Sequence, residues 1–344
     1  MKNQTTAGLF DEQFRLEKIS RQKDPLEKLQ AHIDFEIFRS ALHRMEDKDK
    51  DQSQGGRPPY DAVMMFKILV LQRFYNLSDD QMEFSILDRL SFMRFLGLTL
   101  KDRVPDAKTI WLFRNELTQK GLVKELFRKL DKRLRSHGII VQEGSMVDAT
   151  LVAVPIQRNS REENEQIKND QTPDEWNDQP NKLRQKDTDA RWVTHNGKAH
   201  YGYKDHIKAD TETKIITNYE VTPANVYDNE VLEPLLDKRD KQQPLYGDSA
   251  YRSQSIEEML EEKQIESQIH EKGYRHLKLT GRQRQRNKKK SKTRARVEHI
   301  FAFMENSMNG IFIRCRSLVR AATDIGLMNI TYNLFRLVQL KVAL

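Results

Sequence analysis

The chain has 344 residues, of which 37% are hydrophobic and 32% charged, and its formal net charge is +8. This length and composition allow one large domain or two medium domains, each with a real core. The surplus of positive charge favours a polyanionic partner. The single cysteine, Cys315, excludes an internal disulfide and a cysteine-rich zinc module, and it suits a reducing compartment.

Membrane and export signals are missing from the sequence. No apolar run approaches the roughly 20 residues that span a bilayer. The first residues, "MKNQTTAGLFDEQF", lack the apolar segment of a signal peptide. We therefore expect a soluble, cytoplasmic protein that faces DNA.

The first part of the chain shows helical patterns only. Apolar residues recur at near-helical spacing after Asp24-Pro25, which is a typical helix start. Residues 60–98 have a dense apolar pattern that predicts two or three packed helices, with Ser78 as an N-cap. Residues 104–138 predict two more helices that end at Gly138. We expect a helical N-terminal domain over 1–138 and no strand before about residue 139.

After Gly138 the pattern changes to strands. The β-branched run "GSMVDATLVAV" is the first, and "AHYGYKDHIKAD", "TKIITNYEVTPAN" and "QPLYGDSAY" also have strand character. Helical patterns lie around the last of these and close the chain. Residues 157–190 are so polar that they predict an insertion or a mobile loop without a core. The order predicts an α/β domain over 139–344, with a mixed sheet flanked by helices.

Three carboxylates of this second domain could carry chemistry. Asp148 interrupts an apolar strand, so it either points outward from a sheet edge or is buried and needs a partner such as a metal ion. Asp248 follows a short strand, where it is either an ordinary turn residue or lies at the ligand-binding end of a sheet. Glu298 lies on the amphipathic helix predicted for "RARVEHIFAFME", beside its apolar face, where it either relieves repulsion among arginines or contributes a ligand.

Taken together, the three carboxylates make a more specific arrangement. Hard oxygen ligands suit Mg²⁺ or Mn²⁺ rather than zinc. Two such ions would clamp a phosphodiester for in-line attack, one at the nucleophile and the other at the leaving oxygen.

Consecutive blocks of the chain resemble the bacterial insertion-sequence-five transposases. The blocks are "MVDATLVAVP", "NGKAHYGYKDHI", "VTPANVYDNEVLEPLL", "YGDSAYRS" and "RARVEHIFAFM", and the helical segment that starts at "GGRPPYDAVMMF" resembles the N-terminal domain of the same family. The resemblance covers nearly the whole chain apart from the polar insertion. It implies a DDE triad on an RNase H-like core, in a nucleoid-associated protein.

Residue by residue, the resemblance assigns the triad to Asp148, Asp248 and Glu298, with Mg²⁺ (or Mn²⁺) as the cofactor. It places the family's arginine at Arg294 and the aromatic that follows the second Asp at Tyr251. One position departs from the pattern, because Glu305 stands where a Lys or Arg is often found. If that position contacts the transposon end, Arg314 or Arg316 would have to supply the cation.

A strongly basic stretch precedes Glu298. Twelve Lys or Arg and no Asp or Glu occur from Lys272 to Val297. The stretch is either a solvated linker or a surface that follows DNA phosphates. The expected DNA-binding residues are Lys288, Lys289, Lys290, Arg294, Arg296, Arg314 and Arg316.

The expected function is a DNA transposase that binds terminal inverted repeats, cleaves the ends and joins the 3′-OH to target DNA by two-metal phosphoryl transfer. The N-terminal domain would recognise the ends, mediate dimerisation, or both, and a homodimer is expected because two ends must meet. The alternatives are an RNase H-like nuclease without strand transfer and a catalytically silent DNA-binding regulator.

Overall fold

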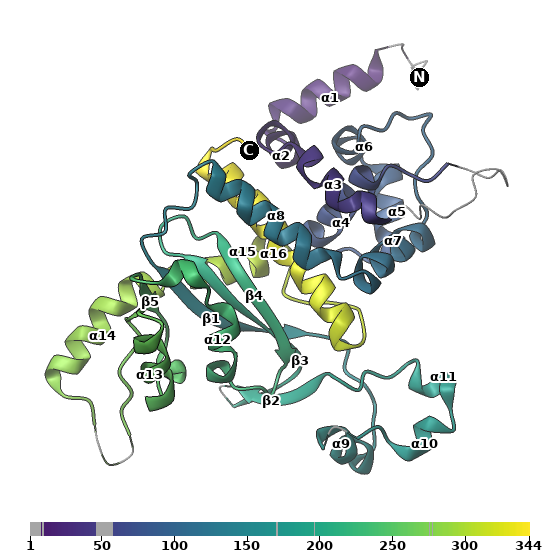
Figure 1. Ribbon diagram of the computed structural model, residues 1–344. Helices are drawn as coiled ribbons and strands as arrows, with labels where there is room; N and C mark the ends of the chain where they lie inside the picture. The colour runs from purple at the N-terminus through teal and green to yellow at the C-terminus, as the bar shows by residue number, and fades with distance from the viewer. Residues whose placement is uncertain are drawn as a thin grey trace, which may run out of the picture.

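A computed structural model describes residues 8, 10–45, 58–169, 171–195, 197–274, 276 and 278–344. A helical part comes first, and a mixed sheet flanked by helices follows it (Figure 1). The helices before the sheet are α1 (Asp11–Arg21), α2 (Pro25–His32), α3 (Arg39–Leu42), α4 (Ala62–Tyr75), α5 (Asp79–Asp88), α6 (Leu90–Leu96), α7 (Ala107–Gln119) and α8 (Leu122–Ser136). In the described residues no strand precedes β1 (Ser145–Ala153), as predicted.

The helix starts follow from local side-chain hydrogen bonds. Ser78 caps α5 in a reciprocal capping box with Gln81, as predicted. Asp24 accepts a hydrogen bond from the Leu26 N–H and precedes Pro25 at the first helical position. The apolar pattern after Pro25 does not form one continuous helix, because α2 ends at His32. Asp34 then accepts from the Glu36 N–H and starts a 3₁₀ turn, so its side chain competes with the helical ladder.

The C-terminal helix α16 (Leu318–Leu340) joins the helical part to the sheet. It packs against α4 and α8 on one side and β4 (Ile216–Pro223) on the other, between the N-terminal helices and the sheet (Figure 1). The rings of Phe74 and Phe335 stack with centroids 3.7 Å apart. The hydrophobic core is therefore continuous from Leu26 to Leu337, across the predicted boundary at 138/139, which stays a prediction.

The sheet has the RNase H-like arrangement, which confirms the predicted fold class. Strand β1 pairs antiparallel with β3 (Lys198–Asp210), and β3 pairs antiparallel with β4. On its other side β1 pairs in parallel with β5 (Pro244–Tyr246), which pairs in parallel with β6 (Glu266–Ser267). Strand β2 (Arg191–His195) pairs with the start of β3. Strands β2 and β6 were not predicted.

Helices cover both faces of this sheet. Val147 packs on one face with α12 (Leu232–Leu235) and α13 (Gln254–Glu262). Ile207 and Tyr219 face α8 and α16 on the other. The chain then forms α14 (Gly281–Arg294) and α15 (Glu298–Ser307). In the described residues no helix is long and apolar enough to cross a bilayer.

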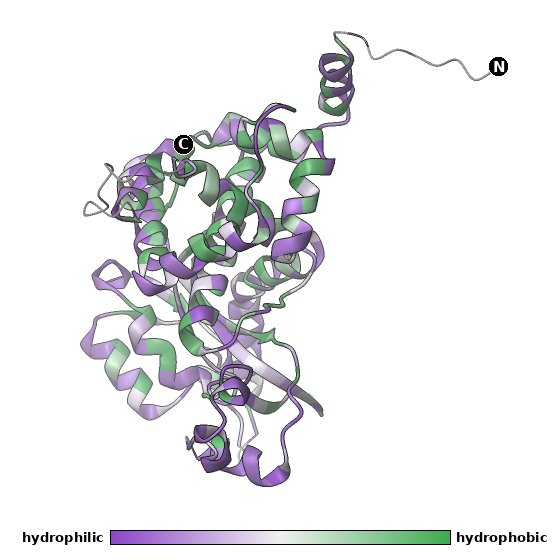
Figure 2. Cartoon of the chain, turned by 90° about the vertical axis from the view of Figure 1, so that its right-hand side faces the viewer, coloured by the Kyte–Doolittle hydropathy of each residue, from purple (hydrophilic) through white to green (hydrophobic). Residues whose placement is uncertain are grey.

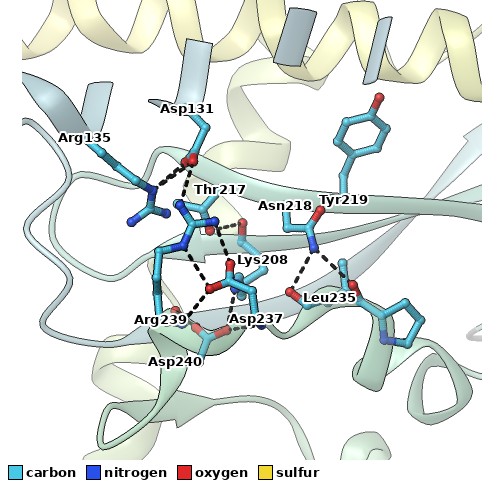
Figure 3. Close-up of polar contacts among 12 residues, drawn as sticks. Asp131, Arg135, Lys208, Thr217, Asn218, Tyr219, Leu235, Asp237, Arg239 and Asp240 are labelled. Carbon is cyan, nitrogen blue, oxygen red and sulfur yellow. Dashed lines mark hydrogen bonds and ion pairs between the residues drawn. The ribbon is translucent and has the colours of Figure 1, made fainter. Parts of the chain in front are cut away.

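A buried ion network ties α8 to the sheet (Figure 3). Lys208 on β3 is only 2% exposed, and its Nζ lies 2.5 Å from Asp240 Oδ2 and 3.1 Å from Asp237 Oδ2. Arg239 continues the network to Asp131 on α8, at 3.2 Å. The network neutralises a lysine that would otherwise be a costly buried charge.

The polar insertion is folded. It contains α9 (Arg161–Lys168), α10 (Asp174–Asn177) and α11 (Pro180–Leu183), which lie at the bottom of the molecule and are largely hydrophilic in Figure 2. Trp176 is nevertheless buried, and its Nε1 donates to Glu163 Oε1 at 2.6 Å. The segment is therefore a folded insertion and not a mobile loop, with one tryptophan held by one glutamate at its centre, although neither Ile167 nor Trp176 belongs to the hydrophobic core clusters.

Candidate active site

Strand pairing brings the two predicted aspartates together. Ser145 pairs with Leu245 and Met146 with Tyr246 in the parallel ladder of β1 and β5. The same offset places Asp148 level with Asp248, just past the end of β5. Gly247 permits the close approach, since a Cβ there would lie 3.2 Å from Val147 Cγ2 and 3.3 Å from Tyr251 Cδ2. Asp248 is close enough to Asp148 to raise its pKa.

Asp148 lies on a central strand, which excludes the outward-pointing edge residue. Its side chain is 16% exposed. Burial raises the pKa of Asp148 to about 6, and the charge of Asp248 adds to the rise, while Arg294 and the Ala149 N–H oppose it. A carboxyl in this environment takes up a proton unless a cation compensates its charge.

Asp248 has the turn role that its sequence allowed, and it also lies beside Asp148. Its Oδ1 accepts a hydrogen bond from the Ala250 N–H at 2.8 Å, which caps the 3₁₀ turn Ser249–Tyr251. The two interpretations are therefore compatible, because this turn fixes the backbone of Asp248 at the end of β5.

Glu298 is the first residue of α15, and its side chain is 59% exposed. The apolar face predicted for this helix is correct, since Val297, Ile300 and Met304 are buried. Arg294 links Glu298 to the sheet, because its Nη1 lies 3.3 Å from Glu298 Oε1 and its Nη2 lies 3.0 Å from Asp148 Oδ2. A guanidinium therefore lies between two of the three predicted ligands.

The donors fit a hard divalent ion in type but not yet in arrangement. Carboxylate oxygens from a rigid strand, a capped turn and a helix start are suitable ligands for Mg²⁺ or Mn²⁺. In the parts of the chain that the structure describes, no three His, Cys, Asp or Glu side chains are gathered closely enough to hold one ion. The guanidinium of Arg294 takes the central place instead, so the catalytic role of the triad stays a prediction.

Tyr251 is fully buried and lies close enough to Asp148 and Asp248 to feel their charges. Its hydroxyl has no hydrogen-bond partner among the described residues. Burial raises the pKa of Tyr251 well above its ordinary value, and the charges of Asp148, Asp228 and Asp248 raise it further. The ring supports the turn that carries Asp248.

Asp228 is the carboxylate that the sequence-based prediction missed. It lies near Tyr251, and its Oδ1 accepts from Lys204 Nζ at 2.8 Å. The block "VYDNE" contains it, but an aspartate in a polar turn gives no local signal of a site. Because Lys204 neutralises it, Asp228 is engaged in an ion pair within the protein.

The predicted DNA-binding residues of the basic stretch divide into two groups. Lys288 and Lys289 are exposed on α14 and make no ion pair or hydrogen bond with described residues. Lys290 donates to the Ile269 carbonyl at 2.9 Å. Arg296 donates to the Thr211 carbonyl at 2.8 Å and to Glu212. Lys290, Arg294 and Arg296 are therefore engaged within the protein.

The C-terminal arginines also contact protein groups. Arg314 donates to Asn76 Oδ1 at 2.8 Å, and Arg316 lies 3.4 Å from the Arg184 carbonyl. Both line a cavity of about 330 Å³ whose other walls come from α4, α5, α7 and the start of α16. Glu305 accepts from the Ile311 N–H at 3.1 Å, so it stabilises the loop after α15 at the position where a cation was expected.

Comparison with known proteins places both halves among transposases. The family described as "Transposase DDE domain" matches residues 141–334, a range that includes Asp148, Asp248 and Glu298. A second family, described as "Transposase domain (DUF772)", matches residues 14–116. Among solved structures, a piggyBac transposase in a synaptic complex with hairpin DNA, determined by cryo-EM, is similar with 13% identity and a TM-score of 0.44. The match covers 92% of this chain and 75% of that one.

Proposed function

We propose that this protein is the transposase of an insertion sequence of the insertion-sequence-five type. The premise is that the chain belongs to the Transposase DDE domain family. It would bind the terminal inverted repeats, cleave the ends and join the freed 3′-OH to target DNA. The observation that supports this best is the β1–β5 register, which sets Asp148 level with Asp248. The contacts of Arg294 with both Asp148 and Glu298 link the third carboxylate to the first, which supports its assignment to the same site.

The three carboxylates would hold Mg²⁺ or Mn²⁺. When bound, such ions supply an activated oxygen nucleophile and charge stabilisation of the leaving oxygen. The three residues differ in how firmly the fold holds them. Asp148 is fixed by a central strand and Asp248 by a capped turn. Glu298 is largely exposed, so it is the ligand that can turn to complete a site on a bound DNA strand.

The outer face of α14 would follow the DNA backbone. Arg284, Lys288 and Lys292 recur every four residues along it, and all three are exposed. The opposite face is fastened to the protein, since Arg286 pairs with Glu271 and Lys290 binds the Ile269 carbonyl. A row of cations that make no ion pair or hydrogen bond with described residues, on a helix whose other face is anchored, suits a sequence-independent phosphate contact. The helical part would then recognise the ends or mediate formation of a homodimer.

A joining assay tests the proposal. Precut end DNA from the sequences that flank the gene is incubated with the protein, Mg²⁺ and a supercoiled target. Joined product is expected from the wild type and none from Asp148→Asn, Asp248→Asn or Glu298→Gln. Glu258→Gln, on the exposed surface of α13, serves as the matched control and should join normally.

The two alternatives predict different products. A nuclease would hydrolyse the DNA and never join it. A silent regulator would bind the ends without cutting them. Full joining by Asp148→Asn would show that the triad is wrongly assigned.

A further inference from the structure

Arg294 occupies a specific position between the predicted metal ligands. It is the last residue of α14, and one end of its guanidinium contacts Asp148 on the central strand while the other contacts Glu298 on α15. Its side chain is 24% exposed. Its Nε is buried and has no hydrogen-bond partner among the described residues. Among the described residues, the two carboxylates are therefore the hydrogen-bond partners of this cation.

We propose that Arg294 is an internal counter-cation, which holds the site in a metal-free resting arrangement and has to leave Asp148 and Glu298 before a divalent ion can bind. This inference rests on the proposed function, because that function assigns the same two carboxylates to the metal. A planar guanidinium can bridge two carboxylates in a fixed fork. A metal ion needs the same oxygens, so the two cations exclude each other.

The surroundings distinguish this role from that of an ordinary stabilising ion pair. An ion pair that only fastens α14 would be expected to use carboxylates outside the site, as Arg286 does with Glu271 at 2.6 Å. Arg294 instead binds the carboxylate oxygens that are predicted to bind the metal. In the described chain no three such side chains are gathered around a metal position. The unpartnered Nε also shows that the fork is not fully satisfied where it lies, so little but the two carboxylates holds it there.

The exchange has a hinge that could permit it. After Arg294 the chain turns through residues 295–297 before α15 begins at Glu298. Glu298 is mostly exposed and can rotate, whereas Asp148 is held in the sheet. Displacement therefore requires movement of the arginine and of Glu298 only. The apparent affinity for metal equals the intrinsic affinity multiplied by the fraction of molecules in which Arg294 has left the site.

Titration of the full-length, metal-free protein with Mn²⁺ by calorimetry tests the proposal. Because a charge-assisted hydrogen bond to a carboxylate is lost, Arg294→Gln is expected to bind Mn²⁺ about tenfold more tightly than the wild type. Arg286→Gln removes an arginine of the same helix whose partner lies outside the site, and its Mn²⁺ affinity should equal that of the wild type. Arg294→Lys keeps the charge without the fork and should lie between the two.

Thermal unfolding supplies a second measurement that does not depend on activity. Without metal, Arg294→Gln should melt at a lower temperature than the wild type, because two carboxylates lose their cation. With saturating Mn²⁺ its melting temperature should rise by more than that of the wild type. A far-UV circular dichroism spectrum like that of the wild type shows that the variant is folded.

The outcomes separate this inference from the proposed function. Equal or weaker Mn²⁺ binding by Arg294→Gln would overturn the internal-cation role, while loss of joining in Asp148→Asn would leave the transposase assignment intact. Absence of Mn²⁺ binding in both the wild type and Arg294→Gln would overturn the internal-cation role together with the metal site. Tighter binding by Arg294→Gln that is abolished by Asp148→Asn would support both.

Discussion

Asp148 and Asp248, a hundred residues apart in the chain, lie level with each other because β1 and β5 pair in parallel with Ser145 opposite Leu245. Their proximity is therefore set by a backbone ladder rather than by loop geometry. The ladder fixes the two main chains, and Gly247 allows the second to pass close to Val147 and Tyr251. Only the third carboxylate, Glu298, approaches from outside the sheet, and it is the exposed one.

The outer row of α14 gives the first prediction. Replacing Arg284, Lys288 and Lys292 by Gln should weaken binding to end DNA and to unrelated DNA by a similar factor, because phosphates carry no sequence information. The plot of log K against log salt should lose roughly 2–3 units of slope, since each phosphate contact contributes about 0.9. Fluorescence anisotropy at several salt concentrations measures both quantities.

The anchored face of the same helix supplies the control for this experiment. Arg286→Gln with Lys290→Gln removes two cations that are engaged with Glu271 and the Ile269 carbonyl. The salt dependence should then change little. If the control loses as much slope as the outer-row variant, DNA does not distinguish the two faces, and the outer row is not the contact surface.

Sequence reasoning reached the fold and the positions of the candidate residues because both leave local traces. An apolar strand interrupted by Asp148 and an amphipathic helix that contains Glu298 can be seen in short windows, and the resemblance put them in order. The place of the Arg294 side chain could not be seen in this way. It depends on how α14 approaches a strand 146 residues earlier in the chain, and no periodicity encodes such an approach.

The insertion and the basic stretch show that composition also limits what can be predicted from the sequence. Both are polar enough to suggest unfolded segments. One buried contact, Trp176 with Glu163, organises the first. A capping box between Thr280 and Gln283 and an anchored inner face order the second into α14. Average polarity cannot reveal a single pair or a two-faced helix.

The buried hydroxyl of Tyr251 gives the second prediction. Tyr251→Phe removes an unpartnered polar group from an apolar cluster that includes Val147 and Leu260. The free energy of unfolding should rise by about 1 kcal/mol. Tyr251→Ala should lower it by about 3–5 kcal/mol, because it leaves a cavity beneath Asp248. Urea denaturation measures both, and marked destabilisation by Phe would mean that the hydroxyl has a partner in solution.

Asp205 gives a pH-dependent prediction away from the candidate site. It is fully buried on β3, Asn329 Nδ2 donates to its Oδ1 at 3.1 Å, and its Oδ2 has no partner among the described residues. Burial raises the pKa of Asp205 to about 7, and the Asn329 hydrogen bond opposes the rise. The folded state thus keeps a proton that the unfolded state releases near pH 4, so stability falls as pH rises from about 4 to about 7.

Asp205→Asn should remove this loss. The variant should be more stable than the wild type by roughly 2–4 kcal/mol at pH 8, and the difference should vanish below about pH 4. Asp102→Asn is a control that should lower the stability at pH 8 instead of raising it, because hydrogen bonds from the Thr99 N–H and hydroxyl lower the pKa of Asp102. Urea denaturation between pH 4 and pH 8 tests both, and a pH-independent difference for Asp205→Asn would contradict the raised pKa.

Lys208 in the network of Figure 3 gives the last prediction. Lys208→Met keeps the apolar stem but leaves Asp240, which is 5% exposed, and Asp237 without their shared cation. Removing one partner of a buried ion pair costs about 3–5 kcal/mol. Lys241→Met, an exposed lysine beside Asp240, is the matched control and should change the free energy of unfolding by less than about 0.5 kcal/mol.

The loss caused by Lys208→Met should depend on pH. Burial raises the pKa of Asp237, but hydrogen bonds from Arg239 and the charge of Lys208 outweigh burial and hold this pKa well below its ordinary value. In the wild type this pair stabilises the fold above about pH 4, and the contribution fades as pH falls through the lowered pKa. The difference in the free energy of unfolding between wild type and variant, measured by urea denaturation, should therefore be largest at pH 7 and smaller at pH 3.

Combining Lys208→Met with Asp240→Asn should recover part of the lost stability at pH 7, because it removes the carboxylate that the lysine neutralised. A double variant less stable than Lys208→Met alone would mean that Asp240 stabilises the fold chiefly through its bonds to the Ser145 hydroxyl and the Asp237 N–H.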